Sequence, residues 1–144
     1  MPVHSIRLLG PWQVAWQSPR PSGAVPLPAV VVLPFDWQQA FGSVAGTVRL
    51  VRRFHRPTNL EPHEQVWLAF QGVGGRGNVC LNGEWLGALA GETTAARFEI
   101  TRLLKPFNEL TVELQFDPAG NSCRGGIYDV VTLTMTTDHG FGPT

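Results

Sequence analysis

The sequence predicts an all-β protein, an antiparallel β-sandwich of jelly-roll form with about eight strands. Three observations support this class. Short segments alternate apolar and polar residues with the two-residue period of half-buried strands. The 16 glycines and 12 prolines are scattered between these segments, as tight connections require. Hydrophobic residues make up 43% of the 144 residues, which is enough for one core, and no segment has a convincing helical period.

The first expected strands lie near the N-terminus. Residues 12–16 form one short strand, and the continuous apolar run over 29–33 is expected to pair inside the sandwich. Residues 34–44 have no clean period, so we expect a long connection that carries Trp37. Trp12 is expected to pack into the core, because a large ring buries much apolar area.

Two strands are expected in the middle of the chain. Over 47–56, apolar residues recur at every second position, but Arg52 falls among them. A guanidinium on an apolar face must lie near a sheet end or find a partner, because burying an unpaired charge is costly. Residues 66–70 alternate in the same way, and we expect Trp67 to pack into the core.

A hairpin is the clearest local signal. Asn82-Gly83 stands between the apolar segments 79–81 and 85–87, and both residues tolerate the positive φ of a type I′ turn. Further on, residues 110–116 alternate strictly between apolar and polar side chains. This pattern predicts an antiparallel strand with one face in water.

The remaining segments are short. Residues 100–104 are expected to form one helical turn, with Thr101 as its N-cap and an end before Pro106. Over 131–136, apolar residues alternate with threonines, which predicts a last strand. Residues that share the inward phase of their strands should form one inter-sheet core: Leu68, Phe70, Val79, Leu81, Leu110, Val112, Leu114, Val131 and Leu133.

Composition restricts the function. The formal net charge is zero, so no basic surplus favours nucleic acid. No apolar run reaches the length of a membrane span, and no secretory signal is visible, so we expect a cytoplasmic protein. Cys80 and Cys123 are either free thiols or, if their strands are neighbours, one bridge. We expect a single domain over 1–136 and a flexible tail over 137–144.

Six sequence blocks between Leu9 and Met135 resemble one known family. They are LLGPWQVAW, LPFDWQQAF, GTVRLVRRF, VWLAFQGVGGRGNVCLNGEWLG, FEITRLLKPFNELTVEL and GGIYDVVTLTM. In this order and spacing they are similar to the N-terminal sugar-binding domain of glycoside hydrolase family 2, the β-galactosidase and β-glucuronidase family. The sequence departs from that pattern at Leu50 and Val51, where Tyr-Arg is usual, and at Glu99, where Asp is usual.

The resemblance implies a galactose-binding-like jelly roll that stands beside a catalytic barrel. The family enzymes continue into an immunoglobulin-like domain and then the barrel, which supplies both catalytic glutamates. These 144 residues resemble neither part, so the resemblance predicts a carbohydrate-binding-type domain that is not itself an enzyme and needs no cofactor.

A sugar site needs an aromatic face for the pyranose ring and planar polar side chains for its hydroxyls. The aromatic candidates are Trp37, Tyr128 and Trp85, and Arg124 and Asn121 are the polar candidates. We expect the site at a loop end, with weakly bound carbohydrate as partner. One alternative is a structural domain that docks to a separate glycosidase or to its own copies. Another is a fragment or degenerate relative that keeps the fold and has little activity. Aromatics exposed together favour sugar binding, whereas a flat apolar patch with an unpaired edge strand favours docking.

Other chemistry finds little support. Hydrolysis of a glycoside requires two carboxylates about 5 to 9 Å apart, and the candidates all lie on expected turns or wet faces: Glu84, Glu92, Glu99, Asp117 and Asp129. The four histidines and two cysteines lack the close spacing of a zinc site. The glycine-rich segment 72–77 lacks the Lys-Ser/Thr ending of a phosphate loop, so we expect a strand connection there.

Overall fold

The computed structural model describes residues 4–17, 19, 21–24, 26, 30–58, 60–120 and 124–136. Within these ranges the chain is almost entirely β structure, which confirms the predicted class. The strands are β1 (His4–Arg7), β2 (Trp12–Trp16), β3 (Val30–Val31), β4 (Gly46–His55), β5 (Gln65–Phe70), β6 (Val73–Gly74), β7 (Arg76–Leu81), β8 (Glu84–Leu89), β9 (Glu92–Thr93), β10 (Ala96–Glu99), β11 (Phe107–Phe116), β12 (Gly126–Ile127) and β13 (Val131–Thr136).

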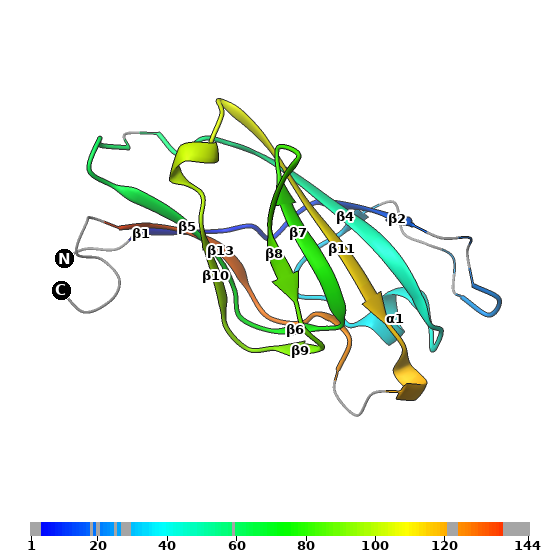
Figure 1. The fold of residues 1–144 in the computed structure, drawn as a ribbon. Coiled ribbons are helices and arrows are strands. Elements are labelled where there is room, and N and C mark those ends of the chain that lie inside the picture. Colours follow the sequence, from blue (N-terminus) through cyan, green and yellow to red (C-terminus); the bar gives the residue numbers. More distant parts are fainter. Residues whose placement is uncertain are drawn as a thin grey trace.

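Two antiparallel sheets form the sandwich. One has six strands in the order β3-β2-β4-β11-β7-β8, and the other has four in the order β1-β13-β5-β10. A third, small sheet of β12, β6 and β9 lies at one end, beside the helix α1 (Trp37–Phe41) (Figure 1). The described strands number thirteen rather than about eight, because two-residue strands leave no period in the sequence.

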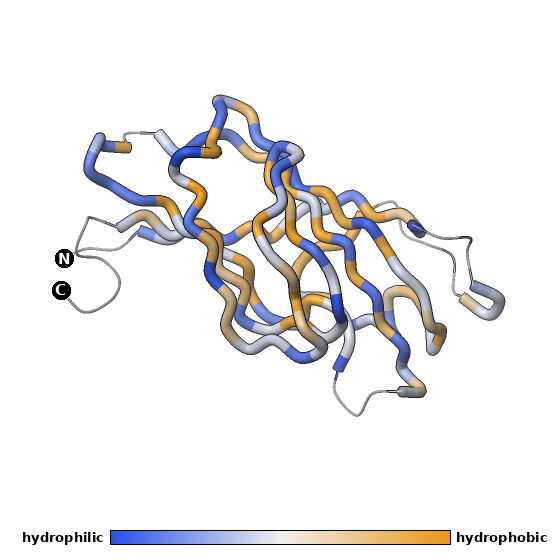
Figure 2. Tube along the Cα trace, in the orientation of Figure 1, coloured by the Kyte–Doolittle hydropathy of each residue, from blue (hydrophilic) through white to orange (hydrophobic). Residues whose placement is uncertain are grey.

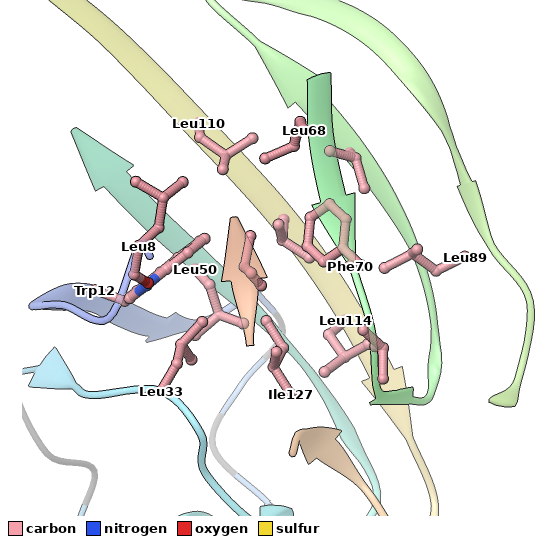
Figure 3. Close-up of a cluster of buried hydrophobic side chains, with 14 of the residues drawn as sticks. Leu8, Trp12, Leu33, Leu50, Leu68, Phe70, Leu89, Leu110, Leu114 and Ile127 are labelled. Carbon is pink, nitrogen blue, oxygen red and sulfur yellow. The ribbon is translucent and has the colours of Figure 1, made fainter. Parts of the chain in front are cut away.

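The core between the sheets contains all nine predicted residues, each buried. Trp12 is buried as predicted, and its indole nitrogen donates to the carbonyl of Leu8 at 2.8 Å. Figure 3 shows Leu50, Phe70 and Leu114 among the side chains that fill this space. The alternating hydropathy along β4 and β11 (Figure 2) is the reason that one face of each strand enters the core.

The predicted hairpin is present. β7 and β8 pair around Asn82 and Gly83, whose φ values of 53° and 84° are those of a turn with two left-handed residues. A bulge between Val79 and Cys80 shifts the register of the return strand, so Cys80 stands opposite Trp85. The glycine-rich segment 72–77 links β5 to β7, as expected, but it also contains the short strand β6 and the start of β7.

The segment 34–44 is not a plain connection. It contains α1, whose N-cap Asp36 accepts a hydrogen bond from the backbone N–H of Gln39 at 3.1 Å. A five-residue helix is too short to show a helical period, so the sequence pattern missed it. The predicted strand over 29–33 is shorter, since β3 spans Val30–Val31 and lies at a sheet edge; residue 29 is outside the described ranges.

The predicted helical turn over 100–104 is a 3-10 turn over Thr101–Leu103. Thr101 is not its N-cap. Instead, the Thr101 hydroxyl accepts a hydrogen bond from the backbone N–H of Val66 at 2.9 Å, which ties the turn to β5. The hydroxyl is therefore used by a tertiary contact rather than by the helix end.

The side of the sheet that Trp67 faces differs from expectation. Trp67 does not enter the core: it is half-buried on the outer side of β5, with the Arg97 guanidinium 5.4 Å from its ring centroid. In β13 both the apolar residues and the threonines are buried. Arg52 has a hydrogen-bond partner, as expected, because it donates to the Arg53 carbonyl. Burial lowers the pKa of the Arg52 guanidinium below its usual value.

Two sequence predictions fall outside the described ranges. The tail over 137–144 and Cys123 lie there, so the boundary of the domain at residue 136 stays a prediction. Cys80 is a free, half-buried thiol on β7.

Candidate functional site

The loop end chosen from the sequence is filled by its own aromatic residues. Trp37 has 0% of its surface exposed, and its ring packs against Phe41 and Phe116 at centroid distances of 4.8 and 5.6 Å. Its indole nitrogen donates to the Val44 carbonyl at 2.9 Å. Trp37 therefore closes the end of the sandwich and offers no face to a sugar, which corrects the prediction for this residue.

Tyr128 and Arg124 lie together at the same end. The Arg124 guanidinium stands 5.2 Å from the Tyr128 ring centroid, and Trp37 is held nearby because its backbone N–H donates to the Gly125 carbonyl at 3.0 Å. The cation over the ring occupies one face of Tyr128. The ligand role of this pair stays a prediction, and Asn121 is outside the described ranges.

Trp85 is separate from that end. It is 64% exposed. In the sheet register Trp85 is paired with Cys80 of β7, and Cys80 is paired with Thr111 of β11. Phe116, which packs against Trp37, marks the α1 end of β11. Thr111 is five residues from Phe116, which is about 17 Å along the strand. The structure therefore does not bring the predicted site residues together: Tyr128 and Arg124 are at the α1 end, and Trp85 is near the hairpin.

Trp85 belongs to a different surface, the solvent-facing side of the six-stranded sheet, which we call the outer face. Cross-strand partners point to the same side of a sheet, so the register defines its rows. One row is Arg49, Glu113 and Asn78, and the next contains Thr111, Cys80 and Trp85. Further members are Thr47, Val51, Arg53, His55, Arg76, Phe107, Glu109 and Gln115.

A shallow polar depression lies on the outer face, toward the Gln115 end of β11. Its lining is Gly77 together with the polar residues Gln17, Thr47, Arg76, Asn78, Glu113 and Gln115. Trp85 adjoins it, because its indole nitrogen donates to Asn78 Oδ1 at 3.3 Å. In the described ranges, Arg76 and Glu113 make no side-chain hydrogen bond or ion pair. Their donors and acceptors are thus available to a ligand.

A second hollow, the hairpin-end pocket, lies where β11 begins. It has a volume of about 450 Å³, and its lining includes Arg53, His55, Lys105, Phe107 and Glu109. Phe107 is 72% exposed, and its ring centroid is 4.7 Å from that of His55. Arg53 pairs with Glu109 at 3.0 Å.

Two asparagines hold the backbone of the hairpin-end pocket. Asn82 Oδ1 accepts from the Glu109 N–H at 2.9 Å, and its Nδ2 donates to the Leu103 carbonyl and to Asn108 Oδ1 at 3.1 and 3.0 Å. Buried Asn108 bonds both the N–H and the carbonyl of Lys105 at 2.8 Å. The turn residue Asn82 thus also joins the hairpin to the segment that carries Lys105 and Phe107.

Sequence reasoning missed Phe107 and Asn78 as surface site residues. Phe107 shares the phase of the polar residues Glu109 and Thr111, so extending the expected strand to residue 107 would have placed it on the wet face. Asn78 gave no signal of its own, because strand alternation alone does not tell which outward side chains gather beside an aromatic.

The other chemistry considered gains no support from the geometry. The five candidate carboxylates, Glu84, Glu92, Glu99, Asp117 and Asp129, are all exposed. Among the residues that the structure describes, no group of three or more histidine, cysteine or acidic side chains is placed to hold a metal. No helix in the described ranges is long and apolar enough to cross a bilayer.

Comparison by sequence finds no relative: no family model and no curated protein matches this chain. Comparison by structure finds similar proteins. An FMN-binding β-glucuronidase from Faecalibacterium prausnitzii L2-6 is similar over 94% of this chain and 23% of its own, with a TM-score of 0.75 and 22% identity. A putative β-galactosidase from Bacteroides fragilis is similar over 95% and 24%, with a TM-score of 0.73 and 24% identity.

A further β-glucuronidase from Faecalibacterium prausnitzii matches over 94% of this chain and 32% of its own, with a TM-score of 0.71 and 20% identity. The chain thus spans about a quarter to a third of these proteins. At these identities the likeness concerns the fold. The chain has the β-sandwich fold of one part of known β-glucuronidases and β-galactosidases, as the resemblance of its sequence blocks implies.

Proposed function

We propose that this chain is a non-catalytic accessory domain of a β-glycosidase and that it binds carbohydrate on its outer face. The observation that carries the proposal is the exposed Trp85, which lies beside Asn78 at the edge of the polar depression. The fold shared with one part of β-glucuronidases and β-galactosidases supplies the context.

The chemistry of the outer face fits a pyranose. One face of a sugar ring presents C–H groups that pack on an indole, and its rim presents hydroxyls that both donate and accept. Asn78 offers a planar amide, Glu113 accepts, and Arg76 donates. A shallow surface buries only part of a ligand, so affinity should be on the order of millimolar to tens of micromolar.

The test is calorimetric titration of the purified chain with a panel of hexopyranosyl oligosaccharides, repeated for Trp85→Ala. We expect saturable binding and a loss of about tenfold in affinity when the indole is removed. Trp67→Ala is the matched control, because Trp67 is half-buried on the other sheet. Absence of binding at tens of millimolar would contradict the proposal, as would an equal loss in the control.

A second function, docking to the remainder of a β-glycosidase, is favoured by a specific surface. Four of the six exposed large hydrophobic residues in the described ranges lie at the β1 and β3 edges of the two sheets: Ile6, Leu9, Val30 and Val32. The Leu33 N–H donates to the Leu9 carbonyl at 2.7 Å, which holds the two segments side by side. Exposed apolar edges of this kind pair readily with another surface.

This docking function has its own test. The chain is used as bait in an extract of its source cells, beside a Leu9→Asp, Val32→Asp double variant. We expect recovery of a barrel-bearing β-glycosidase, identified by mass spectrometry, and its loss with the variant. Equal recovery by both baits, or recovery of no glycosidase, contradicts docking through this edge and leaves the outer face unaffected.

A further inference from the structure

We infer that the hairpin-end pocket binds the carboxylate of an acidic sugar residue, a uronic acid whose ring lies against Phe107. The inference rests on the proposed carbohydrate binding and specifies the class of sugar. It is separate from Trp85 and the polar depression, which require no charge on the ligand.

The pocket carries an excess of positive charge. Three cationic or basic side chains line it, Arg53, His55 and Lys105, against the single carboxylate of Glu109. The Arg53 guanidinium forms an ion pair with that carboxylate, with 3.0 Å between Nη2 and Oε2. In the described ranges the Lys105 ammonium has no ion-pair or hydrogen-bond partner, so it is available to an anion. Charge-assisted hydrogen bonds between an ammonium and a carboxylate are among the stronger polar contacts.

The pocket also has an apolar platform. Phe107 is the most exposed large hydrophobic residue in the described ranges, at 72%, and it meets His55 edge-on at an interplanar angle of 61°. A tilted contact leaves a face of the phenyl ring open to a ligand. An aromatic face beside a free ammonium suits a sugar that carries a carboxylate better than a bare inorganic anion, which has no apolar surface.

The platform and the charge are held in place before any ligand binds. Asn108 bonds the Lys105 backbone on both sides at 2.8 Å, and Asn82 links Asn108 to the hairpin. Fixing the backbone lowers the ordering cost of binding. The exposed lysine side chain keeps its own freedom, so the expected gain from its charge is modest.

Phe107 and Trp85 are placed to contact one oligosaccharide. Along β11, Phe107 precedes Thr111 by four residues, about 13 Å, and Trp85 lies two strands across from Thr111, about 10 Å. A chain of several sugar residues is long enough to reach both rings. The acidic residue would occupy the hairpin-end pocket and neutral residues would cover Trp85.

The experiment compares a glucuronic-acid-containing oligosaccharide with its matched neutral glucose analogue, by calorimetry on the full chain. We expect the acidic ligand to bind about fivefold more tightly at low salt and the difference to shrink as salt screens the charge. Lys105→Gln should abolish the preference and leave the neutral affinity unchanged. Arg102→Gln is the control, since Arg102 is an exposed cation on the neighbouring 3-10 turn that does not line the pocket.

Two further arms separate the sources of the signal. Inorganic phosphate and sulfate, added at constant ionic strength, should not compete with the acidic oligosaccharide. Phe107→Ala should weaken the binding of the acidic oligosaccharide. Lys105 is the only lysine of the chain, so amine acetylation should mimic Lys105→Gln. Equal affinity for the acidic and neutral ligands overturns this inference, while Trp85-dependent binding of the neutral ligand would leave the proposed function standing. Competition by phosphate, or a preference that survives Lys105→Gln, also overturns it.

Discussion

The two aromatic regions of this molecule differ in what surrounds them. At the α1 end, Trp37 packs at right angles to Phe41 and is shielded completely from water. On the outer face, Trp85 and Phe107 project from strands into solvent. The aromatic of the short helix α1 thus closes the core here, whereas these two strand aromatics point away from it.

The polar atoms of the two tryptophans show the same difference. The Trp37 indole nitrogen is satisfied by a backbone carbonyl within its own segment. The Trp85 nitrogen bonds to Asn78, an exposed side chain that also lines a depression. The first bond fixes a fold element, and the second can be exchanged for a ligand at little structural cost.

The largest expected effect comes from the buried region. Trp37→Ala should destabilise the domain by about 3–5 kcal/mol, because it removes a fully buried ring and leaves a cavity. Chemical denaturation followed by far-UV circular dichroism measures this loss. Leu114→Ala, at the centre of the inter-sheet core, should cost about 2–5 kcal/mol and serves as the reference. A change below 1 kcal/mol at Trp37 would mean that the α1 end is not part of the core.

The asparagine pair should give the next largest effect. Asn108→Ala removes the partner of the Lys105 N–H and carbonyl, and leaves Asn82 without one of its bonds. We expect a loss of about 1–3 kcal/mol in unfolding free energy, because buried polar groups become unpaired. Hydrogen exchange should rise around 103–109 and stay unchanged at the α1 end. Uniform exchange in both regions would contradict the local role.

The outward aromatics should matter little for stability. Trp85→Ala and Phe107→Ala are expected to change the unfolding free energy by less than about 0.5 kcal/mol, because exposed side chains lose little on truncation. Thermal unfolding of both variants checks this. A loss comparable to that of Trp37→Ala would show that these rings stabilise the fold and are not free surface.

The smallest expected signal is the turnover of glycosides by the chain. The candidate carboxylates are exposed, so we expect no turnover of nitrophenyl β-galactoside, β-glucuronide or β-mannoside by the purified chain. Turnover that persists through purification and disappears when one glutamate is replaced by glutamine would refute the non-catalytic assignment.

Regular strands and tight turns could be predicted from the sequence. β11 alternates over its whole length, and Asn82-Gly83 tolerates the positive φ values that a tight hairpin turn requires, so the local pattern sufficed. α1 could not be found by period, although Asp36 followed three residues later by Gln39 is a capping signal that a closer reading would use. The two-residue strands β6, β9 and β12 depend on tertiary pairing, which single-sequence patterns do not contain.

The site was harder to predict because it depends on register. Trp85 was a candidate from the sequence, but its neighbours on the outer face come from β4, β7 and β11, which are distant along the chain. The absence of a period over 34–44 predicts an exposed loop for Trp37, but an aperiodic segment can equally be buried. Burial of its ring between strand ends is a consequence of packing.

The most direct test of the central claim is a two-dimensional NMR titration that follows the indole N–H signals of the five tryptophans with a hexopyranosyl oligosaccharide. We expect the Trp85 signal and the Asn78 side-chain amide to shift progressively, while Trp37 and the backbone around Tyr128 stay unchanged. Shifts confined to Trp37 and Tyr128, or no shift at any signal at tens of millimolar ligand, would contradict carbohydrate binding on the outer face.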